Sequence, residues 1–472
     1  MQFIGSLLKH VWAIIALGLL AGCVRFQPKP ISPAQTATRL DSRTLDNPDL
    51  KAFLERNLHH GLTNWPAGPW DFERLTLAAF YYHPSLEVAR ADWRVAASGI
   101  ETAKEWPNPT ATWSLLYEPV PDAFSPWIPG LVFDLPIETA GKRRLRTEQA
   151  RHQSESARFG IATAAWQVRS QLRASLLDFV AARQRVEMLQ HQTALRQDFA
   201  GRLKQQLKAG AISAVELNAA RLALLRTEAD LTDAQRMLAE SRPRLAGAMG
   251  LPATALEGVD VQFGLTPPGA AEGLTAGQVR RLALLSRADI LGALADYAAS
   301  QSALQLAIAK QYPDIHLAPG YSFNAGNAGE NDWQIGATVE LPLLNQHKGA
   351  IAEATARREA SAARFLALQA KVMTDIDIAA ASFRAGQTNL AAIEELTAAQ
   401  AAQERTIKEQ LQAGAADRLD LLTAELELNA ADLVRLDAQV KLQQAVGTLE
   451  DAVQRPLDLP PAIFQSKPGD AH

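Results

Sequence analysis

The chain has a single cysteine, Cys23, among its 472 residues, so an intrachain disulfide is excluded. A catalytic thiol needs a base partner, and no histidine lies near Cys23 in the sequence. Aromatic residues make up only 6% of the chain, while alanine is abundant, a composition that fits long, closely packed helices better than a large globular core. The formal net charge of −4 gives no indication of a nucleic-acid partner.

Motifs for catalysis and for metal binding are also missing. No nucleophile, base and acid cluster along the chain as a hydrolase requires. The nine histidines are scattered, and the adjacent pair His59-His60 has no cysteine or acidic residue at a zinc-ligand spacing. We therefore expect no catalytic function, no metal site and no cofactor.

The sequence of the N-terminus predicts a targeting segment. Lys9 precedes an apolar run over residues 11–21, which has signal-peptide length and is too short to span a bilayer. The run ends in Leu20-Ala21-Gly22-Cys23, which resembles the lipobox of bacterial lipoproteins. That resemblance implies cleavage before Cys23 and lipid on its thiol and new amino group. Because Val24 follows, not aspartate, the implied address is the periplasmic face of the outer membrane. The alternative is an ordinary signal peptide with an incidental cysteine.

The rest of the chain contains an internal duplication. The phrase LKAGAISAVEL, which starts at Leu207, returns as LQAGAADRLDL at Leu411, 204 residues later. Three more landmarks recur in the same order, at offsets of 204, 206 and 206 residues: Asp92-Trp93 with Asp296-Tyr297, Trp106-Pro107 with Tyr312-Pro313, and Asp134-Leu135-Pro136 with Glu340-Leu341-Pro342. These landmarks indicate a duplication of about 200 residues.

Long helices dominate each half. Residues 137–242 and 343–455 contain no proline and are rich in alanine, which predicts helix. Apolar residues step by three or four along one such run, as on one helical face: Ile161, Ala165, Val168, Leu172, Leu176 and Phe179. Two shorter helices, over 72–105 and 213–247, together match the length of the long helix over 141–209, roughly 100 Å. The second half repeats this layout with 276–311, 348–413 and 417–450.

Four short segments alternate like strands, over residues 110–117, 130–136, 314–323 and 333–341. In the first, Trp113 and Tyr117 share an apolar face, while Thr112 and Ser114 share a polar one. This pattern fits membrane strands with an apolar lipid face and a polar lumen, but also a four-stranded sheet on a soluble core. Four strands cannot close a membrane barrel, because open edges leave backbone groups unpaired in lipid. If the strands span a membrane, several copies of the chain must share one barrel.

This layout resembles the TolC-type outer membrane efflux factors, over residues 72–456. The resemblance implies a mainly α fold with a small β part, in which three chains form a hollow α-barrel continued into a shared 12-stranded transmembrane β-barrel. It further implies export as the function, with a periplasmic adaptor, an inner-membrane pump of the resistance-nodulation-division type and outer membrane lipid as partners. The segments HPSL at His83, WPNP at Trp106 and PIETAGKR at Pro136 resemble most the branch that serves heavy-metal pumps.

The repeated phrase marks the turn at the periplasmic tip in that family. Gly210 and Gly414 suit the left-handed conformation that ends a helix. Ser213, with Glu216 three residues on, forms a capping-box pattern that starts the next helix, and Asp417 is an N-cap residue in the second copy.

Acidic residues provide the candidate gate and lumen positions. Glu216 and Asp420 lie six residues after their glycines, and the resemblance places Asp420 at the closed constriction. Three symmetry-related carboxylates there would repel one another and attract cations. The family often has a second acid three positions on, where this chain has Thr423. Both acids also favour a helix N-terminus. Asp134 and Glu340 hold matching places on the polar strand faces, as candidate lumen acids.

The basic run Lys142-Arg143-Arg144 follows a strand, so it either lies near inner-leaflet headgroups or forms a solvated helix start. Two other classes remain open: a periplasmic coiled-coil structural lipoprotein without a pore, and a hydrolase on a helical scaffold. Drug or protein export is the alternative cargo. The expected organisation is a signal peptide (1–22), a lipid-anchored arm (23–71), a first repeat (72–250), a linker (251–275), a second repeat (276–455) and a tail (456–472).

Overall fold

A computed structural model describes residues 25–63, 65–66, 68–119, 126–265, 276–324 and 330–456. The predicted signal peptide, the lipidation residue Cys23 and all but the start of the expected tail lie outside these residues. The chain divides into two units at Arg43. The first contains helix α2 (Pro33–Asp41), and every other element described below belongs to the second.

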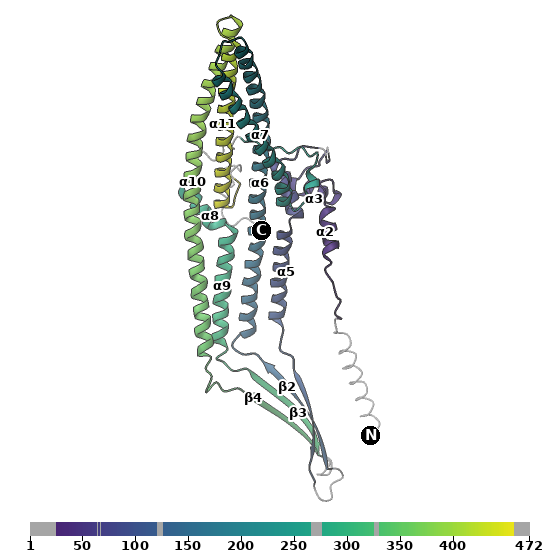
Figure 1. Ribbon diagram of the computed structural model, residues 1–472. Coiled ribbons are helices and arrows are strands. Elements are labelled where there is room, and N and C mark those ends of the chain that lie inside the picture. The colour runs from purple at the N-terminus through teal and green to yellow at the C-terminus, as the bar shows by residue number, and fades with distance from the viewer. Residues whose placement is uncertain are drawn as a thin grey trace. The chain divides into compact units, whose positions relative to one another are not determined.

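The second unit is mainly helical and carries one small sheet, which confirms the predicted fold class. The long helices α6 and α10 run beside the shorter helices from the sheet to two chain reversals at the opposite end (Figure 1). The helices are α3 (Pro48–Leu58), α4 (Phe72–Tyr82), α5 (Pro84–Lys104), α6 (Lys142–Lys208), α7 (Ala214–Met249), the 3-10 turn η1 (Ala253–Leu256), α8 (Ala276–Ser286), α9 (Ala288–Ala309), α10 (Lys348–Gln412) and α11 (Arg418–Val453).

Two helices predicted as continuous are broken. The helix expected over 72–105 splits at His83, because Pro84 disfavours helical geometry in the residue before it, and His83 is extended (φ −70°, ψ 125°). The helix expected over 276–311 splits at Arg287, the position 204 residues later. No proline marks this second break. The guanidinium of Arg287 instead donates to the carbonyls of Asp451 and Ala452 at the end of α11, and it pairs with Asp289.

The four strands form one antiparallel sheet in the order β1-β2-β3-β4. β1 spans Thr110–Tyr117, β2 Trp127–Ile137, β3 Ile315–Asn324 and β4 Glu330–Val339, so three of them shift or extend by a few residues against the expected ranges. β2 from the first repeat pairs with β3 from the second, which joins the two halves of the duplication. Within the described residues, β1 and β4 each have one strand neighbour only.

The strand register keeps one apolar and one polar face across the whole sheet. On the apolar face, Trp113 lies opposite Leu131, and Leu131 lies opposite Tyr321. The next residue along each strand faces the other way. That second face carries mostly small and polar residues: Thr112, Ser114, Asp134, His316, Ser322, Gln334 and Thr338. Leu116, Ile128 and Val132 also lie on it. The alternation seen in single strands therefore adds up to a two-faced sheet.

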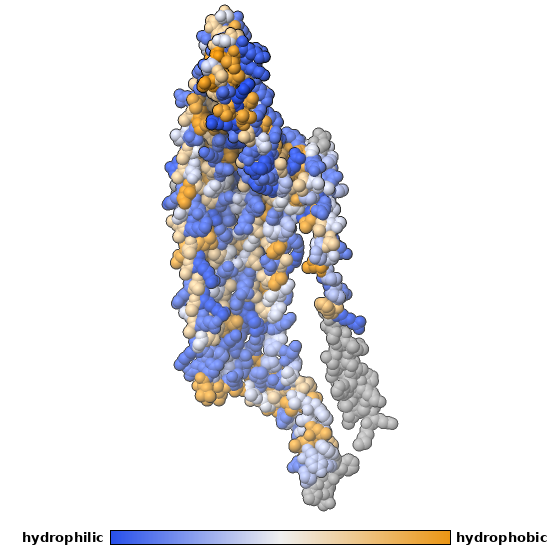
Figure 2. Space-filling view, in the orientation of Figure 1, coloured by the Kyte–Doolittle hydropathy of each residue, from blue (hydrophilic) through white to orange (hydrophobic). Residues whose placement is uncertain are grey.

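Three apolar clusters hold the described helices together, and the two larger ones are each built mainly from one repeat. The first packs α3, α4, α6 and α7 around fully buried Leu75, Leu176 and Met249. The second packs α8, α10 and α11 around Ile376 and Leu442. On the visible face in Figure 2, hydrophilic residues cover much of the long helices, while hydrophobic residues gather at the base of α10. Leu343 and Leu344 are exposed in the segment that leads into that helix.

Candidate functional site

Both chain reversals at the helix tips use the same backbone motif. Gly210 has φ +74° and Gly414 has φ +75°, a left-handed backbone region that residues with a Cβ rarely adopt. The N–H of Ala211 donates to the carbonyl of Gln206 at 2.9 Å, and Ala415 donates to Gln410 at 2.8 Å. These bonds, with those from the glycine N–H groups, form the motif that ends a helix on a left-handed glycine. The repeated phrase therefore stops one helix and reverses the chain.

The helices that follow the two turns are capped unequally. At α11, the N–H of Asp420 donates to the carboxylate of Asp417 at 2.8 Å, and the N–H of Asp417 donates back to Asp420 at 2.8 Å. This reciprocal capping box uses one oxygen of the candidate gate residue Asp420. At α7, the hydroxyl of Ser213 accepts from the N–H of Glu216 at 3.4 Å, a longer and weaker bond than those at α11. Asp420 and Glu216 are both exposed in the single chain.

An ion pair ties the second tip to the first repeat. Arg418, the first residue of α11, lies 3.5 Å from Asp198 of α6 and 3.5 Å from Glu425 of its own helix. Arg202 lies 3.0 Å from the other oxygen of Asp198. The matching residues at the 204-residue offset from Asp198 and Arg202 are Ala402 and Thr406, so this bridge has no counterpart in α10. Sequence reasoning missed it.

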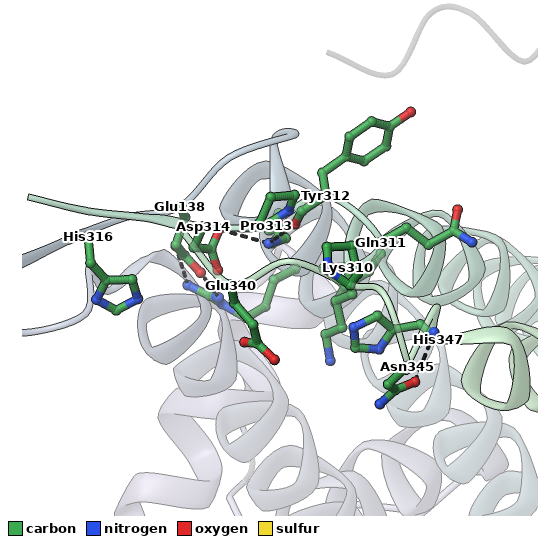
Figure 3. A pocket seen from close by; sticks show the side chains of 14 residues that line it. Glu138, Lys310, Gln311, Tyr312, Pro313, Asp314, His316, Glu340, Asn345 and His347 are labelled. Carbon is green, nitrogen blue, oxygen red and sulfur yellow. Dashed lines mark hydrogen bonds and ion pairs between the residues drawn. The ribbon is translucent and has the colours of Figure 1, made fainter. Parts of the chain in front are cut away.

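The two candidate lumen acids lie at different places. Asp134 is on the polar face of β2, and both of its carboxylate oxygens lie 3.1 Å from Nδ1 of His316 on β3. Glu340 lies one residue beyond the end of β4. It lines a cavity of about 380 Å³ at the junction of sheet and helices. Figure 3 shows Glu340 in this cavity, with His316 toward the strands and Asn345 and His347 toward α10.

The same junction is held by one ion pair between the two repeats and by a second within the first repeat. Nζ of Lys142 donates to Asp314 at 2.7 Å and to the carbonyl of Tyr312 at 2.6 Å. Lys142 is only 7% exposed, so the prediction that it lies at a headgroup or in solvent is wrong. Its neighbour pair, Arg146 with Glu138 at 2.7 Å, lies on the same side of α6.

A buried charge cluster joins the middle of α6 to the last turn of α11, and so joins the two repeats. One oxygen of Glu450 on α11 accepts from Arg169 and from Arg173 of α6, both at 2.8 Å. Glu450 is 2% exposed. Burial raises the pKa of the adjacent Asp451 above its ordinary 3.8, against hydrogen bonds from Ser170 and Trp166 that lower it. The stability that Asp451 contributes is therefore present below pH 3.8 and is lost as the pH rises through the raised value.

Neither a metal cluster nor a helical span marks the described part of the chain. It contains no group of three or more His, Cys, Asp or Glu residues arranged to hold a metal ion. None of its helices is long and apolar enough to cross a membrane.

Comparison with known proteins gives one family and one fold. The family model "outer membrane efflux protein" matches residues 79–251 and 279–453. The cobalt-zinc-cadmium resistance protein CzcC of Cupriavidus metallidurans is 22% identical over 325 residues, which are 68% of this chain and 76% of that protein.

Solved outer membrane channels share the architecture. CusC is 18% identical, with a TM-score of 0.65 over 84% of this chain and 95% of that one. VceC of Vibrio cholerae is 19% identical, with a TM-score of 0.65 over 82% and 96%. Because the family model covers most of both repeats, the chain belongs to the outer membrane efflux protein family, whose members are channels and not enzymes.

Proposed function

We propose that this chain forms a homotrimeric duct that conducts its cargo passively from a periplasmic adaptor and an inner-membrane pump to the cell exterior. The two-faced sheet carries this proposal. Its outward apolar face suits lipid, and its polar face suits a water-filled lumen. Its edge strands β1 and β4 expose unpaired backbone, which is not tolerated in a bilayer. Three copies joined edge to edge, β4 to β1, would close a 12-stranded barrel.

Heavy-metal cations are the proposed cargo, and drugs or other small molecules are the second candidate. The likeness to a cobalt-zinc-cadmium resistance protein supports the first. The polar strand face also carries Asp134, which in a trimer adds three carboxylates to the lumen, and Glu340 adds three more at its base. These acids favour cations by charge alone and need no fixed metal site.

A lipid on Cys23 would tether the duct to the outer membrane. The proposal rests on the lipobox-like segment Leu20–Cys23. One lipid-modified terminus adds membrane affinity but does not span the bilayer, so the barrel remains the path across it. A mature protein whose N-terminal peptide carries no lipid mass would remove this part of the proposal and leave the duct intact.

The function is tested by planar-bilayer recording of the purified mature protein, after its mass in detergent is measured. We expect a trimer that gives small, cation-preferring channels with a low open probability, because the tips close the duct. A monomer or dimer without channels, whose strands are accessible to water-borne probes, would favour a structural lipoprotein without a pore.

Asp420 is proposed as the gate residue, and two substitutions separate its charge from its capping role. Asp420→Asn keeps an oxygen for the N–H of Asp417, while Asp420→Ala removes both the charge and this reciprocal bond and leaves Asp417 as the N-cap residue. We expect both variants to lose cation preference by a similar factor, and Asp420→Ala alone to destabilise the start of α11 by about 1 kcal/mol. Glu216→Gln at the other tip is the matched control. Unchanged cation preference in both Asp420 variants would exclude a carboxylate ring.

A further inference from the structure

We propose that a basic groove at the base of the sheet binds the phosphate of an anionic phospholipid. This inference rests on the proposed placement of the sheet in the outer membrane. The groove lies where α5 ends and α6 begins, and it encloses about 530 Å³. Four basic side chains and one acidic side chain line it: Lys104, Arg143, Arg144, Arg151 and Glu138.

The positive charge of the groove is only partly neutralised. Its single acid, Glu138, is bound by Arg146. Lys104 and Arg144 have acidic partners within their own helices, at 2.7 and 2.8 Å. Arg143 and Arg151 have no acidic partner among the described residues. A guanidinium binds phosphate oxygens through paired N–H groups, so these two arginines are suited to a phosphate diester.

An exposed tryptophan accompanies the arginines. The guanidinium of Arg143 stacks 3.9 Å from the ring centre of Trp106 and donates to the carbonyl of Lys104 at 3.3 Å. Trp106 precedes β1 and is 61% exposed, although its ring is large and apolar. Tryptophan beside arginine is typical of the membrane–water interface, where the ring contacts acyl chains and the cation contacts headgroups.

The groove lies across α6 from the cavity that contains His316, and Glu138 borders both. Lys142 and Arg146 line the cavity that also contains His316, a residue of the polar strand face. At about 100° per residue along a helix, Arg144 and Arg151 project from the opposite side of α6. Arg144 and Arg151 therefore lie away from that cavity, with Arg143 on the flank between the two sides, and in the proposed barrel this side faces lipid where the strands meet the helices. In the outer membrane this end lies at the leaflet that borders the periplasm.

The test measures lipid binding to the full-length trimer. Purified protein is titrated in detergent with phosphatidylglycerol or with zwitterionic phosphatidylcholine, and bound lipids are counted by native mass spectrometry. For the double variant Arg143→Gln/Arg151→Gln, we expect phosphatidylglycerol binding to weaken about 30-fold and phosphatidylcholine binding to stay unchanged. The matched control, Arg221→Gln/Arg405→Gln, removes two exposed arginines from α7 and α10 and should bind as the wild type does.

Several outcomes would overturn the inference. Equal phosphatidylglycerol binding by the double variant and the wild type would exclude a lipid site in the groove. Full displacement of the lipid by millimolar inorganic phosphate would make it a free-anion site. Loss of the trimer in the double variant would assign Arg143 and Arg151 to the contact between copies of the chain. A conducting trimer without charge-dependent binding contradicts this inference alone, whereas a wild type without trimer or channels contradicts the proposed function.

Discussion

Replacing Arg418 by glutamine is expected to raise the open probability of the channel about tenfold to a hundredfold. Arg418 links α11 to Asp198 of α6, and so joins the two hairpins at the tip of one chain. A partly exposed ion pair of this kind contributes about 0.5–1 kcal/mol. In the proposed trimer, three copies of this ion pair stabilise the same closed state. The sum of their free energies gives the predicted change in open probability.

Single-channel recording measures this effect, and a matched variant controls for charge. Arg236→Gln also removes an exposed, ion-paired arginine, but the partners of Arg236, Asp233 and Glu240, lie in its own helix α7. That variant should gate as the wild type does. Asp198→Asn should open the channel as well, and combining it with Arg418→Gln should add little, because both remove the same bridge. Equal open probability in Arg418→Gln and Arg236→Gln would show that the bridge does not hold the tip closed.

Substituting Glu450 by alanine is expected to destabilise the fold by about 3–5 kcal/mol. The carboxylate is 2% exposed and accepts from Arg169 and Arg173. Both arginine side chains are nearly buried, at 12% and 10% exposure. Without Glu450, two guanidinium groups remain in a region of low dielectric without their main counter-charge. Because the cluster joins α6 to α11, its loss should loosen the contact between the two repeats.

Denaturant unfolding in detergent, followed by circular dichroism, measures the change in the free energy of unfolding. Glu353→Ala is the control, because Glu353 pairs with Arg357 on an exposed face of α10 and should cost less than about 1 kcal/mol. Replacing all three charges by apolar residues, as Arg169→Leu/Arg173→Met/Glu450→Leu, should restore most of the lost stability. A cost for Glu450→Ala no larger than that for Glu353→Ala would mean that water reaches the cluster.

Local patterns made much of this fold predictable, and long-range pairing explains what was missed. Period-two alternation located the strands, and glycine with capping residues located the tips, because both signals lie within a few residues. The break at His83 had a signal in Pro84, whereas the break at Arg287 depends on carbonyl groups 164 and 165 residues away. The ion pairs Lys142–Asp314 and Arg169–Glu450 join residues 172 and 281 positions apart, and no local pattern identifies such partners.

The unequal lengths of the two long helices limit how alike the repeats can be. α6 and α10 begin 206 residues apart but end 204 residues apart, so α10 is two residues shorter than α6. Two residues correspond to a rotation of about 200° around the helix axis. When the two helices are aligned at the sheet end, residues that correspond to each other at the tip therefore point in nearly opposite directions around the helix axis. In the proposed trimer the backbone would repeat six times around the tip, while the surface chemistry would repeat only three times. An adaptor that docks there would meet two kinds of hairpin in alternation. Three adaptors would then bind per trimer, although the six hairpins have similar backbones.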